Sequence, residues 1–254
     1  MGRLAGKVAV ISETEAGIGR ATALRFAEEG ASVVCADADP AHAEETARLV
    51  RAAGGAAVAI GADVTTVAGC EAVADAAVQA FGGVDVLYNN TAMLVRGTVE
   101  QTSVEDFDRI FEVNVRPVFL LSRACIPLLR ARGGGSIVNL ASSLAFIGYA
   151  GLPAYTATKG AVRMLSKTMA LDHAHEQIRV NCVCHGGIDD PLLRSLFAAQ
   201  PDPEAALAAF LTTIPAGRLA TLTDMANAAL FLACDESAST TGSEILVDGG
   251  QTAR

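Results

Sequence analysis

Three side chains in the second half of the chain have the types and spacing needed for acid–base chemistry without a metal. Tyr155 and Lys159 are four residues apart, and Ser142 comes thirteen residues before Tyr155, at the end of an apolar run. Residues i and i+4 of a helix share one face, so the phenol and the ammonium group would lie side by side. An ammonium group favours the phenolate, and we expect the pKa of Tyr155 to fall from about 10 toward neutral. Such a phenol can exchange protons at working pH, and the Ser142 hydroxyl could hold a substrate oxygen.

An isolated Tyr-x-x-x-Lys pair is more often a surface contact, but a nucleotide-binding pattern upstream favours the catalytic interpretation. Gly17-Ile18-Gly19 follows the first apolar run and begins the first helical pattern. Glycines there let the backbone approach a pyrophosphate at a helix N-terminus. Asp37 ends the second apolar run. A carboxylate in that place accepts hydrogen bonds from the adenosine ribose hydroxyls and repels a 2′-phosphate. The alternative is a glycine-rich helix entry followed by an acidic turn.

Short apolar runs alternate with longer helical patterns along the whole chain. This alternation favours right-handed βαβ crossovers, and therefore a Rossmann-type, doubly wound parallel sheet with helices on both faces. The expected strands are Val8–Ile11, Ser32–Ala36, Ala57–Ala62, Val84–Asn89, Ser136–Leu140, Arg179–Cys184 and Glu244–Val247. The expected helices are Ile18–Glu29, Pro40–Ala53, Thr66–Phe81, Ser103–Arg130, Ala154–Glu176 and Leu222–Ala233.

The pattern contains no linker or repeat, so we expect a single α/β domain over residues 1–254. Residues 1–135 would form mainly its dinucleotide-binding half, and residues 136–254 its catalytic and substrate-binding half. Residues 186–217 contain four prolines and form an irregular stretch, which we interpret as a candidate lid.

Composition limits the partners and the compartment. Hydrophobic residues make up 51% of the 254 residues and charged residues 19%, which favours a buried oligomeric interface. The net charge of -9 disfavours nucleic acid and anionic membranes as partners.

The N-terminus has no apolar signal segment, so we expect a cytoplasmic protein with six reduced cysteines. We expect Cys182 and Cys184 to be strand residues. His173 and His175 do not share a helix face, so we expect no metal site.

With these residues the chain resembles the short-chain dehydrogenase/reductase family over essentially its whole length. Gly17-Ile18-Gly19 is similar to the family's cofactor turn, and Val247-Asp248-Gly249-Gly250 to its C-terminal segment. The remaining markers are Asp63-Val64, Asn89-Asn90 and a tetrad formed by Asn114, Ser142, Tyr155 and Lys159.

The resemblance implies hydride transfer between a nicotinamide cofactor and a carbonyl/alcohol pair. Tyr155 would be the acid/base, Ser142 would hold the substrate oxygen, Lys159 would hold the ribose and tune Tyr155, and Asn114 would anchor a water. It further implies that Ser12, Asp63, Val64, Asn90 and the Ile188 backbone contact the cofactor. Many members are homotetramers, which agrees with the apolar composition.

The chain departs from the family pattern at the first motif glycine, which is replaced by Glu13. A glycine there can need positive φ, which glutamate tolerates poorly. Glu13 could turn outward or bond the adenosine ribose, with NAD still bound. Alternatively, it weakens dinucleotide affinity and leaves a catalytically silent nucleotide-binding or scaffold subunit. The complete tetrad favours the first interpretation. With Glu15 and Asp37 nearby, we expect NAD(H) over NADP(H).

Three further departures lie near the chemistry. Thr91-Ala92 replaces Ala-Gly and adds bulk beside the cofactor. Asp190 replaces a threonine; an ionised Asp190 near the nicotinamide would favour NAD+ over NADH, or its side chain caps the following helix or points to solvent. His185 replaces a proline; it could be a second proton-relay group, but we favour a loop histidine without that role.

Apolar side chains in the candidate lid and around the motifs favour an alicyclic, steroid-like, terpenoid or acyl secondary alcohol or ketone as substrate. Packing of the same side chains on the core or on a neighbouring subunit is an equal alternative. The residues are Leu94, Leu144, Phe146, Tyr149, Leu152, Leu192, Leu193, Leu196, Phe197, Leu207, Phe210 and Leu211.

Overall fold

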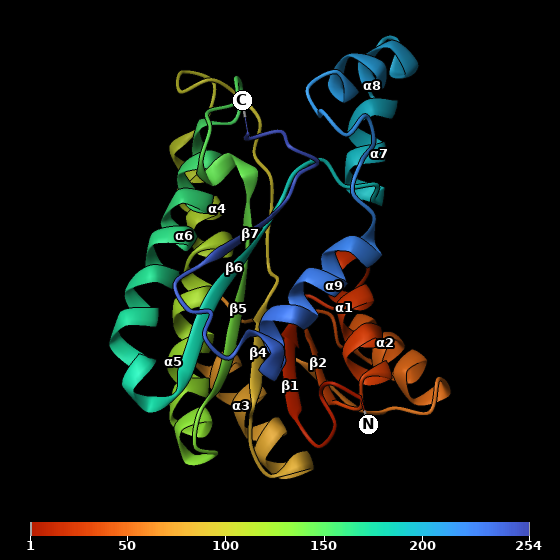
Figure 1. The fold of residues 1–254 in the computed structure, drawn as a ribbon. Helices are drawn as coiled ribbons and strands as arrows, with labels where there is room; N and C mark the ends of the chain where they lie inside the picture. The colour runs from red at the N-terminus through yellow and green to blue at the C-terminus, as the bar shows by residue number, and fades with distance from the viewer. Residues whose placement is uncertain (1, 254) are drawn as a thin grey trace.

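The computed structural model describes residues 2–253 and contains one parallel sheet of seven strands in the order β3-β2-β1-β4-β5-β6-β7 (Figure 1). This confirms the expected Rossmann-type, doubly wound sheet. Each predicted strand is present, with ends that differ by at most two residues. The strands are β1 Val8–Ser12, β2 Ser32–Asp37, β3 Ala56–Gly61, β4 Val86–Asn89, β5 Gly135–Ser142, β6 Ile178–His185 and β7 Glu244–Val247.

Helices cover both faces of the sheet because its strands are apolar on both sides. One face packs against α3 (Val67–Phe81), α5 (Arg116–Ala131) and α6 (Pro153–His173), around Val73, Leu121 and Val162. The other face packs against α1 (Gly17–Glu28), α2 (Pro40–Ala52) and α9 (Leu222–Ala233), around Phe26 and Met225. Figure 1 shows these two layers on either side of the strands.

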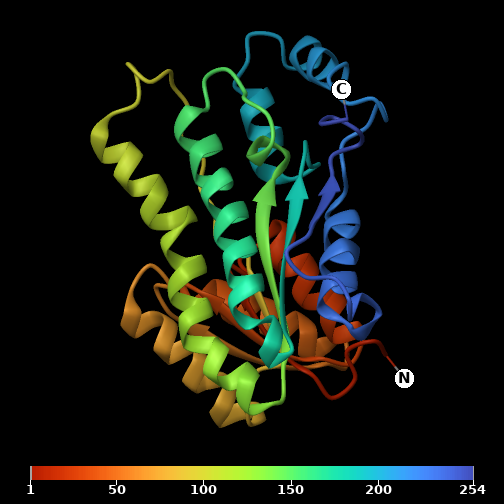
Figure 2. The ribbon, with the colours of Figure 1, turned by 60° about the vertical axis from the view of Figure 1, so that its left-hand side comes forward.

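The single helix expected over Ser103–Arg130 is wrong, because the structure has two helices there. α4 covers Val104–Asn114 and α5 begins at Arg116, with Val115 between them at φ -111° and ψ -48°. Pro117 lies in the first turn of α5, where a residue without an N–H is tolerated. The two helices run nearly end to end along the sheet (Figure 2).

Residues 186–217 contain two helices, so the irregular stretch expected from the sequence is wrong. They are α7 (Pro191–Ala198) and α8 (Pro203–Leu211), which project beyond the carboxyl ends of the strands (Figures 1 and 2). Pro191 and Pro203 begin these helices instead of breaking them, since Asp190 and Asp202 each cap the turn that follows.

Parallel strands end at the same edge of the sheet, so the candidate cofactor and catalytic residues that follow β1, β2, β4, β5 and β6 lie along one edge.

All six cysteines are buried and unpaired, and Cys182 and Cys184 are strand residues as expected. Among residues 2–253, no helix combines the length and the apolar character needed to cross a bilayer.

Candidate active site

Ser142, Tyr155 and Lys159 meet at the carboxyl end of β5. Ser142 is the last residue of β5, and α6 begins two residues before Tyr155, so both residues are fixed by regular structure. The Lys159 ammonium lies 5.6 Å from the centre of the Tyr155 ring and donates a hydrogen bond of 3.0 Å to the carbonyl of Leu140. All three are buried. The helical spacing therefore places the phenol and the ammonium group on one face, as expected.

The expected fall in the pKa of Tyr155 is wrong for this structure. Burial of the phenol raises its pKa above the ordinary value; the Ser142 hydroxyl opposes this, and the charge of Asp190 adds to it. Burial also lowers the pKa of Lys159 to about 8, against the opposing effect of the Glu13 carboxylate. The spacing argument omitted desolvation, which disfavours the phenolate and the ammonium alike.

His185 contacts the Tyr155 hydroxyl and ends a strand, which corrects its expected place in a loop. It is the last residue of β6 and pairs with Ser142 in the β5–β6 register. Its Nε2 lies 3.1 Å from the Tyr155 hydroxyl oxygen, and its Nδ1 lies 2.8 Å from the carbonyl oxygen of Gly186. Burial, and then the charge of Lys159, lower the pKa of His185 to about 4. The ring is therefore neutral at physiological pH.

Asn114 fixes the chain segment that follows β4. Its side-chain amide donates to the carbonyl of Met93 at 2.9 Å and to the Thr158 hydroxyl at 3.1 Å, and its oxygen accepts from the Met93 N–H at 2.7 Å. The amide thus ties residues near the cavity to α6. The geometry supports a role in shaping the site, whereas the water-anchoring role implied by the resemblance stays a prediction.

The turn between β1 and α1 has the close approaches expected of a cofactor turn. A Cβ at Gly19 would lie 2.0 Å from the backbone oxygen of Glu13, and Gly17 has φ +55°. The Ser12 hydroxyl accepts hydrogen bonds from the Asn90 N–H at 3.0 Å and from the Thr91 hydroxyl at 3.1 Å. Ile18 lies in the first turn of α1, beside the cavity described below.

Glu13 adopts φ 54°, the left-handed conformation that makes a glycine favourable at this position. Its side chain turns neither outward nor toward the end of β2. Instead, Oε2 accepts a hydrogen bond of 2.7 Å from the Ala92 N–H, at the edge of the cavity. The outward direction expected as one alternative is therefore wrong, whereas a bond from Glu13 to the adenosine ribose stays a prediction. The backbone must pass close to Gly19 and Asn90, and from that path the side chain reaches the amide of Ala92.

The Glu13 carboxylate is partly removed from water and interacts with the charge of Lys159. Burial raises the pKa of Glu13 to about 7; the Ala92 N–H and then Lys159 oppose this rise, and Asp37 and Glu15 add to it. Opposite charges on Glu13 and Lys159 each favour the other's ionised form. A negatively charged ligand entering this site would therefore meet a carboxylate that is partly ionised at neutral pH.

Acidic groups gather at the end of β2, as the sequence predicts. Asp37 Oδ2 accepts the Glu15 N–H at 2.9 Å and Oδ1 accepts the Asp39 N–H at 3.1 Å, so each oxygen keeps a further lone pair. The His42 ring lies between the two carboxylates, 3.8 Å from Asp37 Oδ1 and 3.5 Å from Glu15 Oε1.

Asp63 and Val64 follow β3 at the same edge of the sheet. Asp63 Oδ1 accepts the N–H and the hydroxyl of Thr65 at 2.9 and 2.7 Å, and these bonds lower its pKa. Val64 is buried. Asn90 donates to the carbonyl of Glu13, while its own buried Oδ1 has no hydrogen-bond partner within the described residues.

Ile188 and Asp190 lie in the segment that connects β6 to α7. Ile188 pairs with Ala220 in an isolated β-bridge and lines the cavity. Asp190 Oδ1 accepts the Leu193 N–H at 2.7 Å and so caps α7, as the alternative interpretation had it. Its charge is nevertheless close enough to Tyr155 to raise the pKa of that phenol.

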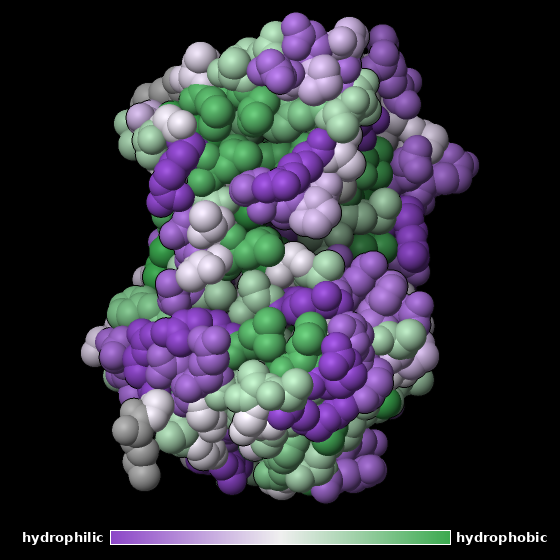
Figure 3. All heavy atoms as spheres, turned by 90° about the vertical axis from the view of Figure 1, so that its right-hand side faces the viewer, coloured by the Kyte–Doolittle hydropathy of each residue, from purple (hydrophilic) through white to green (hydrophobic). Residues whose placement is uncertain are grey.

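A cavity of about 730 Å³ lies between the strand ends and helices α7 and α8. Its polar wall includes Glu13, Ser142, Tyr155 and His185, and Asp190 lies at the side of α7. Its apolar wall comes from both sides of the opening: Met93, Leu94, Leu144, Tyr149, Leu152, Leu193, Leu196, Phe197 and Phe210. Figure 3 shows hydrophobic side chains gathered on the face that carries α7 and α8.

Three expected substrate contacts do not line this cavity. Phe146 lies under the Arg163 guanidinium, with 4.2 Å between the ring centre and the guanidinium carbon. Leu207 and Leu211 do not line the cavity either. Phe197 and Phe210 do line the cavity, as expected, with their ring centres 5.5 Å apart and their planes tilted by 55°. The side chain of Leu192 lies outside the described parts of the structure.

The residues at the strand ends fit a dinucleotide except at one position. Gly19 leaves room for close approach, Asn90 Oδ1 is an unpaired buried acceptor, and Asp37 can accept ribose hydroxyls. Glu13 is the position that does not fit, because its carboxylate projects to the amide of Ala92. Within residues 2–253, no three metal-ligating side chains gather as they would around an ion.

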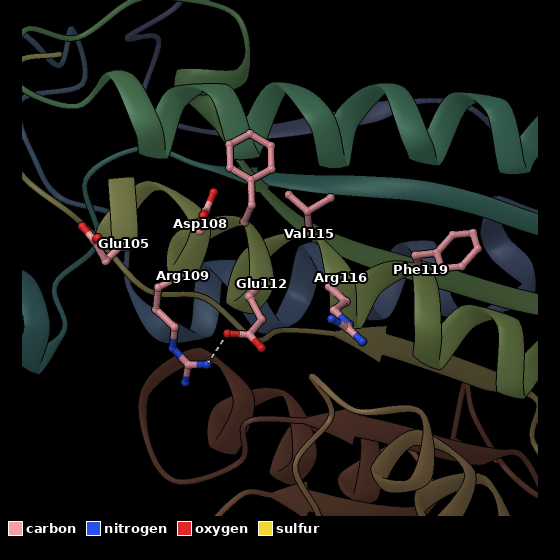
Figure 4. A pocket seen from close by; sticks show the side chains of 8 residues that line it. Glu105, Asp108, Arg109, Glu112, Val115, Arg116 and Phe119 are labelled. Carbon is pink, nitrogen blue, oxygen red and sulfur yellow. Dashed lines mark hydrogen bonds and ion pairs between the residues drawn. The ribbon is translucent and has the colours of Figure 1, made fainter. Parts of the chain in front are cut away.

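A second hollow, of about 710 Å³, lies away from this chemistry on the faces of α4 and α5 (Figure 4). It is lined by Phe111, Val115 and Phe119 and by charged side chains that include the Arg109–Glu112 ion pair.

Comparisons with known proteins agree with the geometry. Residues 13–252 match a family model described as enoyl-(acyl carrier protein) reductase. The chain is 41% identical over 248 residues to a 2,5-dichloro-2,5-cyclohexadiene-1,4-diol dehydrogenase of Sphingobium indicum, covering 98% of this chain and 97% of that protein. It is 39% identical over 251 residues to 3beta-hydroxysteroid dehydrogenase 1 of Eggerthella lenta, covering 98% and 95% of the two chains.

The same likeness holds in three dimensions. A crystal structure of a candidate short-chain dehydrogenase/reductase from Burkholderia xenovorans superimposes with a TM-score of 0.96 at 37% identity, and covers 100% of this chain and 99% of the other.

Proposed function

Because this chain belongs to the short-chain dehydrogenase/reductase family of oxidoreductases, we propose that it interconverts a secondary alcohol and a ketone with NAD(H). The observation that carries the proposal is the buried set of Ser142, Tyr155 and Lys159 on the wall of a cavity beside the β1–α1 turn. The cofactor supplies the hydride acceptor when it is bound. The protein must then hold the substrate oxygen and move one proton.

In this proposal Tyr155 exchanges the proton with the substrate oxygen, and Ser142 donates a hydrogen bond to that oxygen. Lys159 holds its ammonium group under the Tyr155 ring through the Leu140 carbonyl and stabilises any negative charge that develops on the phenol. Asn114 keeps the segment around Met93 in place. Ser12, Gly17, Ile18, Gly19, Asn90 and the backbone of Ile188 would border the cofactor.

The preference for NAD(H) rests on the acidic groups after β2. A 2′-phosphate beside Asp37 and Glu15 would be repelled, whereas ribose hydroxyls could donate to the free lone pairs of Asp37. His42 lies between the two carboxylates, 3.8 Å from Asp37 and 3.5 Å from Glu15, so its ring is directed at them and not at a 2′-phosphate. Asp63 and Val64 would border the adenine.

The apolar wall of the cavity supports an alicyclic or steroid-like alcohol as the substrate class, with terpenoid and acyl alcohols as further possibilities. Both relatives named above are dehydrogenases of ring alcohols by their names, a cyclohexadiene diol and a hydroxysteroid. Rings of this kind would pack against Phe197 and Phe210 while the hydroxyl reaches Ser142 and Tyr155.

The inward direction of Glu13 favours one alternative, a weak or catalytically silent nucleotide-binding subunit. Its carboxylate takes the Ala92 N–H and adds negative charge where a dinucleotide carries phosphates. The buried tetrad argues for catalysis, so the alternative depends on cofactor affinity alone.

The deciding experiment is a titration of the protein with NADH and with NADPH, followed by nicotinamide fluorescence. Micromolar NADH binding with much weaker NADPH binding supports the proposal, and a screen of cyclic secondary alcohols should then give turnover. If the protein binds neither cofactor while Glu13→Gly binds NADH, the silent-subunit function replaces it. Tighter binding and faster turnover with NADPH would refute the NAD(H) assignment.

We also propose a cytoplasmic homotetramer in which residues 1–135 bind mainly the dinucleotide, residues 136–254 carry the catalytic and substrate-binding groups, and residues 186–217 act as a lid. The face of α4 and α5 supports association, because Phe119, which lines the hollow of Figure 4, is 53% exposed, and Val104 at the start of α4 is 71% exposed. Light scattering of the parent and of Phe119→Glu tests it: a tetramer that the substitution splits supports this face, and a parent monomer refutes the assembly.

A further inference from the structure

We propose that His185 is a proton-relay residue, which exchanges a proton with the Tyr155 hydroxyl while Tyr155 exchanges one with the substrate oxygen. This inference rests on the proposed alcohol oxidation. It adds a group at a position where the family usually has proline, a side chain that cannot carry a proton.

The hydrogen bonds of the ring define which nitrogen carries the hydrogen. Nδ1 lies 2.8 Å from the carbonyl oxygen of Gly186, and a carbonyl can only accept, so Nδ1 is protonated. In the neutral ring Nε2 then has a lone pair, and the Tyr155 hydroxyl, 3.1 Å away, must donate to it. The hydrogen of Tyr155 therefore points at His185.

This direction leaves the lone pairs of the phenol for the substrate. Tyr155 and His185 both line the cavity, so an alcohol hydroxyl within it can donate to Tyr155 while Tyr155 donates to His185. The order alcohol, tyrosine, histidine is a continuous path of proton donors and acceptors. It requires no movement of either side chain from the observed contact.

The backbone holds the two groups together. Ser142 and His185 are register partners at the ends of β5 and β6, which fixes their backbones side by side. In this structure the Ser142 hydroxyl donates to the carbonyl of His185 at 3.2 Å, and it would rotate to donate to a bound substrate oxygen. The next residue, Gly186, packs so tightly that a Cβ there would lie 2.8 Å from the Cα of Asp248. Lys159 and Asp190 are the charged groups whose fields reach the Tyr155–His185 pair.

The step balances as follows. In alcohol oxidation the carbinol C–H bond breaks, and its hydride goes to the oxidised nicotinamide dinucleotide. The alcohol O–H bond breaks and a Tyr155 O–H bond forms, while the former Tyr155 O–H bond breaks and a His185 Nε2–H bond forms. The product is a ketone, and the imidazolium releases its proton to water that enters the cavity after the ketone leaves. Ketone reduction runs the same transfers in reverse.

The test compares His185→Gln and His185→Ala with the parent, using a cyclic secondary alcohol such as cyclohexanol and NAD+. Glutamine can accept the Tyr155 hydrogen bond but cannot take the proton. We expect both variants to lose about 100-fold in kcat, the low end of a general-base contribution. Added imidazole should raise the turnover of His185→Ala and leave that of His185→Gln unchanged. His175→Gln, at a side chain 76% exposed, is the matched control and should keep the parent rate.

NADH titration of each variant shows whether the site is still folded, because a relay residue should leave the cofactor dissociation constant within about twofold of the parent. Turnover of His185→Gln near the parent rate would overturn the relay and leave only a hydrogen-bonding role. Failure of imidazole to restore His185→Ala, with cofactor binding intact, would overturn it as well. If the parent itself turns over no alcohol while it binds NADH, the proposed function fails, and the relay fails with it.

Discussion

The strongest quantitative prediction concerns Glu13→Gln, which removes the charge and keeps the shape of the side chain. Burial raises the pKa of Glu13 from 4.5 to about 7, so the folded protein holds a proton on this carboxylate over a range in which the unfolded chain releases it. The contribution to stability is fully present below pH 4.5, decreases as the pH rises, and is lost above about pH 7.

The size of the effect follows from the shift. Each pKa unit corresponds to about 1.4 kcal/mol, and most of the titration falls between pH 5 and pH 7.5, which gives a loss of about 2–3 kcal/mol in the free energy of unfolding. For a chain of this length the loss corresponds to a decrease of about 4–10 °C in Tm. Lys159 titrates in the opposite sense, because its pKa is lowered to about 8 and stability would rise with pH above that value. The comparison therefore stays at or below pH 7.5.

The assay is thermal or urea unfolding of the parent and of Glu13→Gln at pH 5 and pH 7.5, without cofactor. The difference in stability between the two proteins should change by about 2–3 kcal/mol over this interval, in favour of the glutamine variant at the higher pH. Glu15→Gln is the matched control, since Glu15 is exposed at the same turn. A parent–variant difference that is the same at both pH values would refute the reasoning, and would mean that the Glu13 carboxylate faces water.

Three further predictions follow from the site. Tyr155→Phe should abolish alcohol oxidation while NADH titration gives a dissociation constant close to the parent's, because only the hydroxyl is lost; turnover near the parent rate would contradict the role of Tyr155. Asp37→Ala should reduce the ratio of NADH to NADPH affinity by about tenfold or more, since a carboxylate near a 2′-phosphate is removed, and an unchanged ratio in the same titration would contradict the NAD(H) assignment. Asn114→Ala should lower the free energy of unfolding by about 1–3 kcal/mol in urea, because the buried backbone groups of Met93 lose their partner, and a stability equal to the parent's would contradict this role.

The seven strands and five of the six expected helices could be predicted, because apolar runs and helical patterns of these lengths alternate as a parallel sheet covered by helices requires. The grouping of Ser142, Tyr155 and Lys159 follows from helical spacing and from the end of β5. Where the prediction of elements failed, the cause was capping and packing, not the apolar pattern. The division at Val115 and the helices after Pro191 and Pro203 depend on local capping and on packing that periodicity does not carry.

Two further features of the site could not be predicted for the same reason. The contact of His185 with Tyr155 exists because β6 pairs with β5 in a register that brings His185 opposite Ser142. The direction of Glu13 depends on the Ala92 N–H, seventy-nine residues away in the chain. His185 and Glu13 both stood out in the sequence as departures from the family pattern, but the contacts that they make could be seen only in the three-dimensional structure.

The backbone at Glu13 also bears on how this protein can evolve. Its φ of 54° is a conformation that glycine adopts without cost, so the fold has kept the path of the turn although the residue has changed. Both glutamate codons become glycine codons by one substitution at the second base. A lineage carrying Glu13 can therefore return to the family's usual residue in a single step, without any compensating change in the surrounding turn. In the alternative proposed above, in which Glu13 weakens dinucleotide binding, this single change would restore cofactor affinity.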